Sequence, residues 1–93
     1  MTKVKINIDK NKNIFFDCYQ HAGTRDVCIM ASTVCNMVIV SCQKRNISPL
    51  TDEDGHLTYC IEYADDGLLE VVKCAEEVFK EISDQFPEHL KLY

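Results

Sequence analysis

The residues best suited to chemistry are His21 and Cys28, which lie in the segment 20–28, QHAGTRDVC. His21 ends a strand-like run, and Cys28 opens an apolar stretch that is predicted to be a helix. Backbone N–H groups and the helix dipole favour a thiolate at a helix start. A histidine within reach can take the proton from such a thiol. The pair therefore predicts a cysteine hydrolase, with Cys28 as the nucleophile and His21 as the general base.

Two further residues of this region have candidate roles in the chemistry. Asp26 is predicted to be the N-cap of the helix, with Thr24 as the other possible cap. An Asp26 cap would leave the Cys28 N–H unpaired in the first turn, and Asp26 could also orient His21 as the third member of a triad. Ser32 follows Cys28 by one helical turn on the same face. It either donates a hydrogen bond near the thiolate or simply packs as a small residue.

The loop between the two candidate catalytic residues supplies the remaining parts of the predicted site. Ala22 and Gly23 are small enough for a substrate backbone to approach closely. The donors of an oxyanion hole are expected among the backbone N–H groups of Cys28 and of the loop 22–27.

A metal site is the less favoured interpretation of the same cysteines and histidine. Cys18 and His21 have a plausible ligand spacing, but Cys28 and Cys35 are two helical turns apart, about 10 Å along the axis. One ion could not bind both thiols without distortion. We therefore do not expect these residues to bind a metal ion.

Six cysteines invite a disulfide interpretation, which the pattern does not favour. No secretion signal is recognisable, most of the cysteines lie inside apolar runs, and three of them recur every seven residues along one predicted helix. We expect reduced, buried thiols and a cytoplasmic location. A redox role for Cys28 would need a resolving partner, for which Cys18 is the candidate.

The net charge of −5 is divided unevenly along the chain. Residues 1–50 carry seven basic and three acidic side chains, whereas residues 51–93 carry three basic and twelve acidic ones. The acidic half either is a solvated surface or attracts a basic peptide. It argues against a nucleic-acid partner, and the absence of an apolar run of 18 residues argues against a membrane span.

Hydrophobic periodicity predicts the order β-β-α-β-β-α-β within a single domain, residues 1–93. Alternating residues predict strands at 4–8, at 14 to about 21, and at 57–61, and an apolar run predicts a buried helix over 27–43. Residues 47–50 are expected to be irregular or weakly extended, and 51–55 to form a turn. Apolar steps of three and four predict a helix from Asp65 to Phe86, followed by a short strand at 90–92. The expected fold class is α+β: a small two-layer sandwich of an antiparallel sheet and two helices.

The chain resembles the ribosomal-processing cysteine protease family (Prp) of Firmicutes and related bacteria. The likeness spans nearly the whole order of elements, beginning with the N-terminal hairpin. Its specific motifs are short: His21-Ala22, and Asp26-Val27-Cys28 with Ser32. It extends to the tail, Phe86-Pro87-Glu88-His89-Leu90. Members of this family remove an N-terminal extension from a large-subunit ribosomal protein. The resemblance implies a Cys28 nucleophile, a His21 base, a homodimer and no cofactor.

The chain departs from the family pattern between these motifs. Gln20 stands where the family usually has glycine, and the six residues between His21 and Cys28 form a shorter loop than the family's. The shorter loop favours a second hypothesis, a catalytically impaired paralogue that binds a peptide or a ribosomal protein without cutting it.

Overall fold

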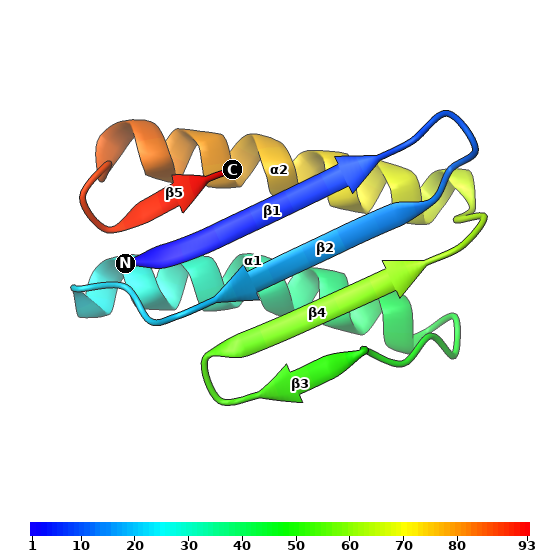
Figure 1. Cartoon of the computed structure of the whole chain (residues 1–93), viewed down its shortest axis with the longest axis horizontal. Helices are drawn as coiled ribbons and strands as arrows, with labels where there is room; N and C mark the ends of the chain where they lie inside the picture. Colours follow the sequence, from blue (N-terminus) through cyan, green and yellow to red (C-terminus); the bar gives the residue numbers. More distant parts are fainter.

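A five-stranded sheet forms one layer of the structure, and two helices form the other (Figure 1). The structure is a computed structural model that describes all 93 residues. Its elements, in chain order, are β1 (Thr2–Ile8), β2 (Ile14–Tyr19), α1 (Arg25–Gln43), β3 (Thr51–Glu53), β4 (His56–Ile61), α2 (Asp66–Gln85) and β5 (Leu90–Leu92). The α+β class and the predicted order β-β-α-β-β-α-β are confirmed.

The strand order in the sheet is β3-β4-β2-β1-β5, and the sheet is mixed rather than wholly antiparallel. Three of the four strand pairs are antiparallel, but β5 runs parallel to β1. The reason is the connection through α2, which crosses over the sheet from β4 to β5 and lets β5 run in the same direction as β4. Strands β4 and β1 are both antiparallel to β2, so β5 is also parallel to β1. The first and last strands therefore lie side by side (Figure 1).

The core lies between the sheet and the helices because alternate strand residues point to one face. Val4, Phe16 and Tyr59 are almost completely buried on that face. The ring of Phe16 meets that of Phe79 on α2, with centroids 6.3 Å apart. The open face of the sheet mixes polar side chains such as Lys5 and Asp17 with Phe15 and Tyr19.

Helix α1 buries only its inner face, so the prediction of a buried helix was wrong for its outer face. Its inner face, including Val27, is buried, whereas Ile29, Met37 and Val40 are about half exposed on the outer face. By length and apolar composition alone, α1 could also cross a membrane. Its inner face nevertheless packs against the sheet, as the apolar face of a helix does in a two-layer fold.

Strand β3, the first of the two strands between the helices, lies at 51–53 and not at 47–50. The turn predicted at 51–55 is therefore shorter than expected. Thr51 pairs with Thr58, and the chain reverses at Asp54 and Gly55. The acidic side chains of this segment obscured a strand because sequence reasoning associates them with turns. On an edge strand they are exposed to solvent and tolerated.

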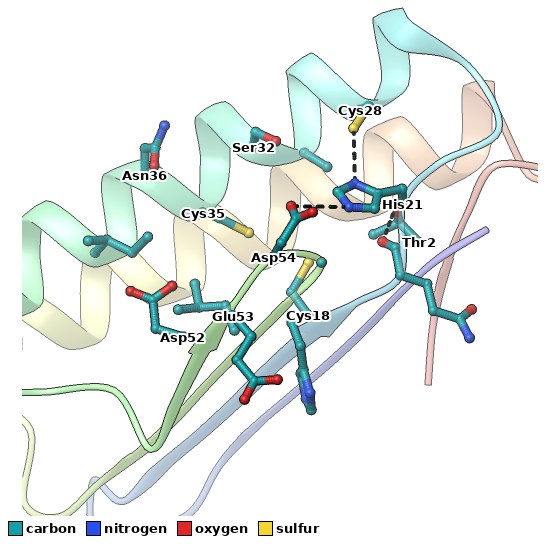
Figure 2. Close-up of a pocket in the computed structure, with 16 residues that line it drawn as sticks. Thr2, Cys18, His21, Cys28, Ser32, Cys35, Asn36, Asp52, Glu53 and Asp54 are labelled. Carbon is teal, nitrogen blue, oxygen red and sulfur yellow. Dashed lines mark hydrogen bonds and ion pairs between the residues drawn. The ribbon is translucent and has the colours of Figure 1, made fainter.

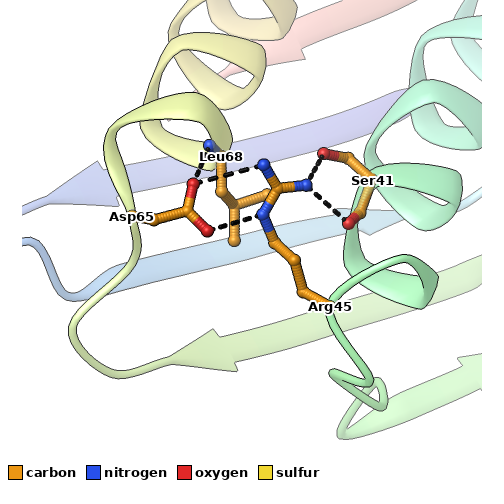
Figure 3. A network of polar contacts seen from close by, with 4 residues as sticks. All are labelled: Ser41, Arg45, Asp65 and Leu68. Carbon is orange, nitrogen blue, oxygen red and sulfur yellow. Dashed lines mark hydrogen bonds and ion pairs between the residues drawn. The ribbon is translucent and has the colours of Figure 1, made fainter.

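Helix α2 begins and ends close to its predicted limits. The Asp65 carboxylate accepts a hydrogen bond from the Leu68 N–H, which makes Asp65 the N-cap. Arg45, just beyond α1, donates to both carboxylate oxygens of Asp65, at 2.7 and 3.2 Å. It also donates to the Ser41 carbonyl at 2.9 Å (Figure 3). One guanidinium therefore joins the end of α1 to the start of α2.

Candidate active site

Three elements meet at one end of the sheet around a cavity of about 340 Å³. They are the end of β2, the first turns of α1 and the turn between β3 and β4 (Figure 2). His21, Cys28 and Ser32, predicted as site residues from the sequence, all line this cavity. The arrangement follows from the short chain between β2 and α1, which leaves little freedom in how the strand end and the helix start face each other.

The thiol of Cys28 faces the imidazole of His21 across the cavity mouth (Figure 2). The Cys28 Sγ lies 3.7 Å from the His21 Nδ1, within hydrogen-bonding reach for sulfur. Cys28 is partly buried, while 59% of the His21 side chain is exposed. This geometry permits proton transfer between the sulfur and Nδ1.

Asp54 contacts the other side of the imidazole, and sequence reasoning missed it. Its Oδ1 lies 3.4 Å from the His21 Nε2, so sulfur and carboxylate engage opposite ring nitrogens (Figure 2). The contact exists because Tyr19 pairs with His56, which brings the β3–β4 turn beside the residues that follow β2. An Asp-Gly pair does signal a turn, but no local pattern indicates what that turn touches.

Two unusual backbone positions hold this corner together. Gln20, directly before the histidine, has φ 68°, and Gly55 has φ 79°. The Gln20 N–H donates to the Gly55 carbonyl at 2.7 Å. A Cβ at residue 55 would lie 3.1 Å from the His21 Nε2, so a glycine there leaves room for the imidazole. The left-handed backbone at residue 20 is a conformation that glycine adopts more readily than glutamine.

The N-cap of α1 is Thr24, so the preferred assignment of the cap to Asp26 was wrong. The Thr24 hydroxyl accepts from the Val27 N–H at 3.3 Å, and Asp26 lies exposed in the first turn. The predicted free N–H of Cys28 is also wrong, because it donates to the Thr24 carbonyl at 3.1 Å. The first-turn N–H groups that have no hydrogen-bond acceptor are therefore those of Arg25 and Asp26.

The other supporting residues separate into two groups. Ser32 lines the cavity one turn below Cys28 (Figure 2). Ala22 packs against the core, and a Cβ on Gly23 would lie 2.8 Å from the His89 Nδ1. Neither Ala22 nor Gly23 is among the residues that line the cavity, and a glycine at 23 leaves room for the His89 ring.

Several of the remaining polar side chains near the cavity are engaged with one another, and others are acidic. His56 Nε2 lies 2.9 Å from the Asp17 Oδ1, and the Thr58 hydroxyl donates to the same oxygen at 2.7 Å. Asp52 and Glu53 add to Asp54 on the side of the cavity opposite α1. No three His, Cys, Asp or Glu side chains are grouped so that they could hold a metal ion together.

No protein-family model and no curated protein matches the chain by sequence. Solved structures do match it by fold. Two are of the ribosomal processing protease Prp from S. aureus, one with a covalently linked product peptide and one with a substrate peptide. Both have a TM-score of 0.80, at 18% and 16% identity, over 99% and 100% of this chain and 97% and 98% of theirs.

A third similar structure is that of SMU.848 from Streptococcus mutans. It has a TM-score of 0.76 at 16% identity, over 99% of this chain and 95% of the other. The fold of this chain is thus that of Prp and of SMU.848, from end to end. The resemblance drawn from the short motifs is confirmed at the level of the fold.

Proposed function

We propose that this protein is a cysteine endopeptidase in which Cys28 is the nucleophile and His21 the general base. The observation that carries the proposal is the 3.7 Å separation of the Cys28 Sγ and the His21 Nδ1 at the mouth of a cavity. The full-length likeness to Prp, whose solved structures contain product and substrate peptides, supports peptide hydrolysis as the reaction. Asp54 is the positioning residue for the imidazole in this proposal.

The reaction proceeds in two halves. His21 Nδ1 takes the thiol proton, and the Cys28 sulfur attacks the scissile carbonyl carbon. The imidazolium then protonates the leaving amine as the C–N bond breaks, which leaves a thioester on Cys28. In the second half, His21 deprotonates a water molecule that attacks the thioester. The new acid leaves, and the thiol regains its proton. The free N–H groups of Arg25 and Asp26 are the proposed oxyanion donors.

The proposed substrate is the N-terminal extension of a bacterial large-subunit ribosomal protein. Ribosomal proteins are basic, and the wall formed by Asp52, Glu53 and Asp54 gives the cavity an acidic side. Opposite charges attract such a peptide and raise its local concentration. We further propose that the protein acts as a homodimer in the cytoplasm, where its six free thiols stay reduced.

The test is cleavage of the host organism's own precursor. Wild-type protein is incubated with the full-length ribosomal protein precursor, and the products are identified by intact mass. We expect loss of the N-terminal extension with wild type and with Cys60→Ala, which alters an exposed thiol outside the cavity. Cys28→Ala and His21→Ala are expected to leave the precursor whole. Equal cleavage by Cys28→Ala and wild type would refute the proposal.

A binding module without catalysis is the second candidate function. The observation in its favour is the short connection between β2 and α1, five residues from Gln20 to Thr24. Wild-type protein that binds the precursor but leaves it whole would support this alternative. Alkylation at mildly acidic pH separates the two: the peptidase requires Cys28 to react before the exposed Cys60 and Cys74, whereas a binding module does not.

A further inference from the structure

Two thiols that the proposed peptidase reaction does not use lie deeper in the same cavity. Cys18 is on β2, three residues before His21, and Cys35 is on α1, seven residues after Cys28. Both line the cavity, and Figure 2 shows their sulfur atoms turned toward one another from the two layers. Cys18 is 8% exposed, and Cys35 is partly buried against the core.

The two thiols also interact chemically. The neighbouring Cys35 thiol lowers the pKa of Cys18, whereas the Cys18 thiol and burial raise the pKa of Cys35. A pair in which one sulfur is easier to deprotonate and the other keeps its proton suits stepwise oxidation, since the thiolate is the form that reacts first. Of the other cysteines, Cys28 faces His21, Cys60 and Cys74 are exposed, and Cys42 is buried.

We propose that Cys18 and Cys35 form a redox-active dithiol that a small peroxide, admitted through the cavity, converts to a disulfide between the sheet and α1. The inference concerns residues outside the proposed catalytic pair and does not depend on peptidase activity. It differs from the sequence-based redox hypothesis, which paired Cys18 with Cys28. The structure gives Cys28 a histidine and gives Cys18 a thiol partner on α1.

The oxidation balances with one peroxide molecule. The Cys18 thiolate attacks a peroxide oxygen, an S–O bond forms and the O–O bond breaks. Cys18 becomes a sulfenic acid, and the departing hydroxide is protonated to water. The Cys35 sulfur then attacks the Cys18 sulfur, the S–S bond forms, and the S–O bond breaks. The Cys35 proton leaves with the hydroxide as a second water. Two thiols lose two electrons, and the peroxide gains them.

The bond would close a loop of the chain that contains both His21 and Cys28. Such a cross-link restricts the unfolded chain, so we expect the oxidised protein to melt about 10 °C above the reduced one. Reduction with dithiothreitol should restore the original melting temperature. An unchanged melting temperature in protein that carries the cross-link would contradict the expected stabilisation.

The experiment exposes the full-length reduced protein to a few equivalents of hydrogen peroxide. Remaining thiols are then alkylated under denaturing conditions and counted by intact mass. We expect four alkylated cysteines instead of six, with the protein itself lighter by two hydrogen atoms. Trypsin should release peptide 13–25 joined to peptide 26–44, because Arg25 separates the two cysteines. Fragmentation of the joined peptide then tells Cys35 from Cys28 and Cys42.

Two variants sharpen the result. Cys28→Ser should still form the cross-link, whereas Cys35→Ala should form none and should carry Cys18 as the free thiol or as its unresolved sulfenic acid. If Cys35→Ala does not fold, the peptide map of Cys28→Ser alone decides. A cross-link to Cys28, six alkylated thiols, or oxidation confined to Cys60 and Cys74 would each overturn the proposal.

Discussion

At the residue scale, surroundings distinguish Cys28 from five other cysteines of the same chemical type. It lies in the first helical turn, at the cavity mouth, with an imidazole nitrogen 3.7 Å from its sulfur. His21 is likewise distinguished from His56, whose Nε2 lies against Asp17, and from His89, whose ring lies against Gly23. Reactivity here depends on neighbours that are supplied by other parts of the chain.

We predict a modest role for Asp54. Its side chain is 97% exposed, so solvent screens its attraction for His21. Asp54→Ala should therefore lower kcat/KM for the precursor by less than about tenfold, against roughly 10²- to 10⁴-fold for His21→Ala. Rates of precursor cleavage measure both effects. A loss for Asp54→Ala as large as that for His21→Ala would show that the carboxylate does more than orient the ring.

Gly55→Ala should disturb the site through the imidazole. The added Cβ would lie 3.1 Å from the His21 Nε2, on a backbone with φ 79°. We expect a loss of stability of about 1 kcal/mol or more, together with slower cleavage. Gln20→Gly is the matched control, because it relaxes the left-handed backbone at φ 68° and should leave the protein at least as stable. Urea unfolding compares the two variants.

At the element scale, the ends of the two helices decide how the layers join. Thr24 caps α1 four residues before Cys28. At the other end, Arg45 binds both the last turn of α1 and the capping carboxylate of α2. Helix ends leave backbone groups unpaired, so a few side chains there control local order.

The observed cap of α1 can be tested by two neighbouring substitutions. Thr24→Ala removes the oxygen that accepts from the Val27 N–H and should cost about 1 kcal/mol of unfolding free energy. Asp26→Ala leaves that hydrogen bond in place and should have the smaller effect. Chemical denaturation of both variants measures the difference. A larger loss for Asp26→Ala would restore Asp26 as the cap.

The Arg45–Asp65 pair should make stability depend on pH. The Arg45 guanidinium and the Leu68 N–H hold the pKa of Asp65 below its usual value. The stabilisation is therefore complete above the unfolded-state pKa, about 3.9. It is lost as the pH falls through the lower folded-state pKa. We expect Arg45→Gln to lower the melting temperature at pH 7, and the difference from wild type to shrink below about pH 4.

A matched control exists for this ion pair. The Lys12 Nζ lies 2.8 Å from the Asp66 Oδ1, but the two side chains are 53% and 87% exposed. Lys12→Gln should therefore change the melting temperature less than Arg45→Gln does, because exposed pairs contribute little. Equal effects of the two substitutions at pH 7 would contradict the role given to Arg45 at the helix ends.

At the scale of the whole molecule, the fold leaves an apolar surface on α1 uncovered. Ile29, Met37 and Val40 lie on the outer face of α1, each between 50% and 59% exposed. A chain of this size buries a modest core, so association of two copies is a natural supplement. The proposed homodimer would bury this face.

Met37→Glu tests the proposed dimer. A charge at the centre of an apolar interface is costly to desolvate, so we expect this variant to sediment as a monomer and the wild type as a dimer. Val78→Glu, at a site on α2 that is 40% exposed, should leave the dimer intact. Analytical ultracentrifugation measures the association. A wild-type protein that remains monomeric at high concentration would refute the proposed dimer.

The sequence by itself determined what depends on neighbours along the chain. Strand alternation, the limits of α2 and the proximity of His21 to Cys28 follow from residue periods and from a short connecting loop. Sequence reasoning was less successful with α1, whose apolar outer face resembles a buried one, and with the strand Thr51–Glu53, whose acidic side chains resemble those of a turn.

Only the tertiary structure decided which distant segments meet. Strand register places Asp54 against His21, and the packing of α1 on the sheet brings Cys35 and Cys18 into one cavity. The parallel pairing of β5 with β1 likewise depends on the path of α2 across the layer. Periodicity assigns each segment a type and a face, but contacts between segments arise from register and packing, which no local pattern encodes.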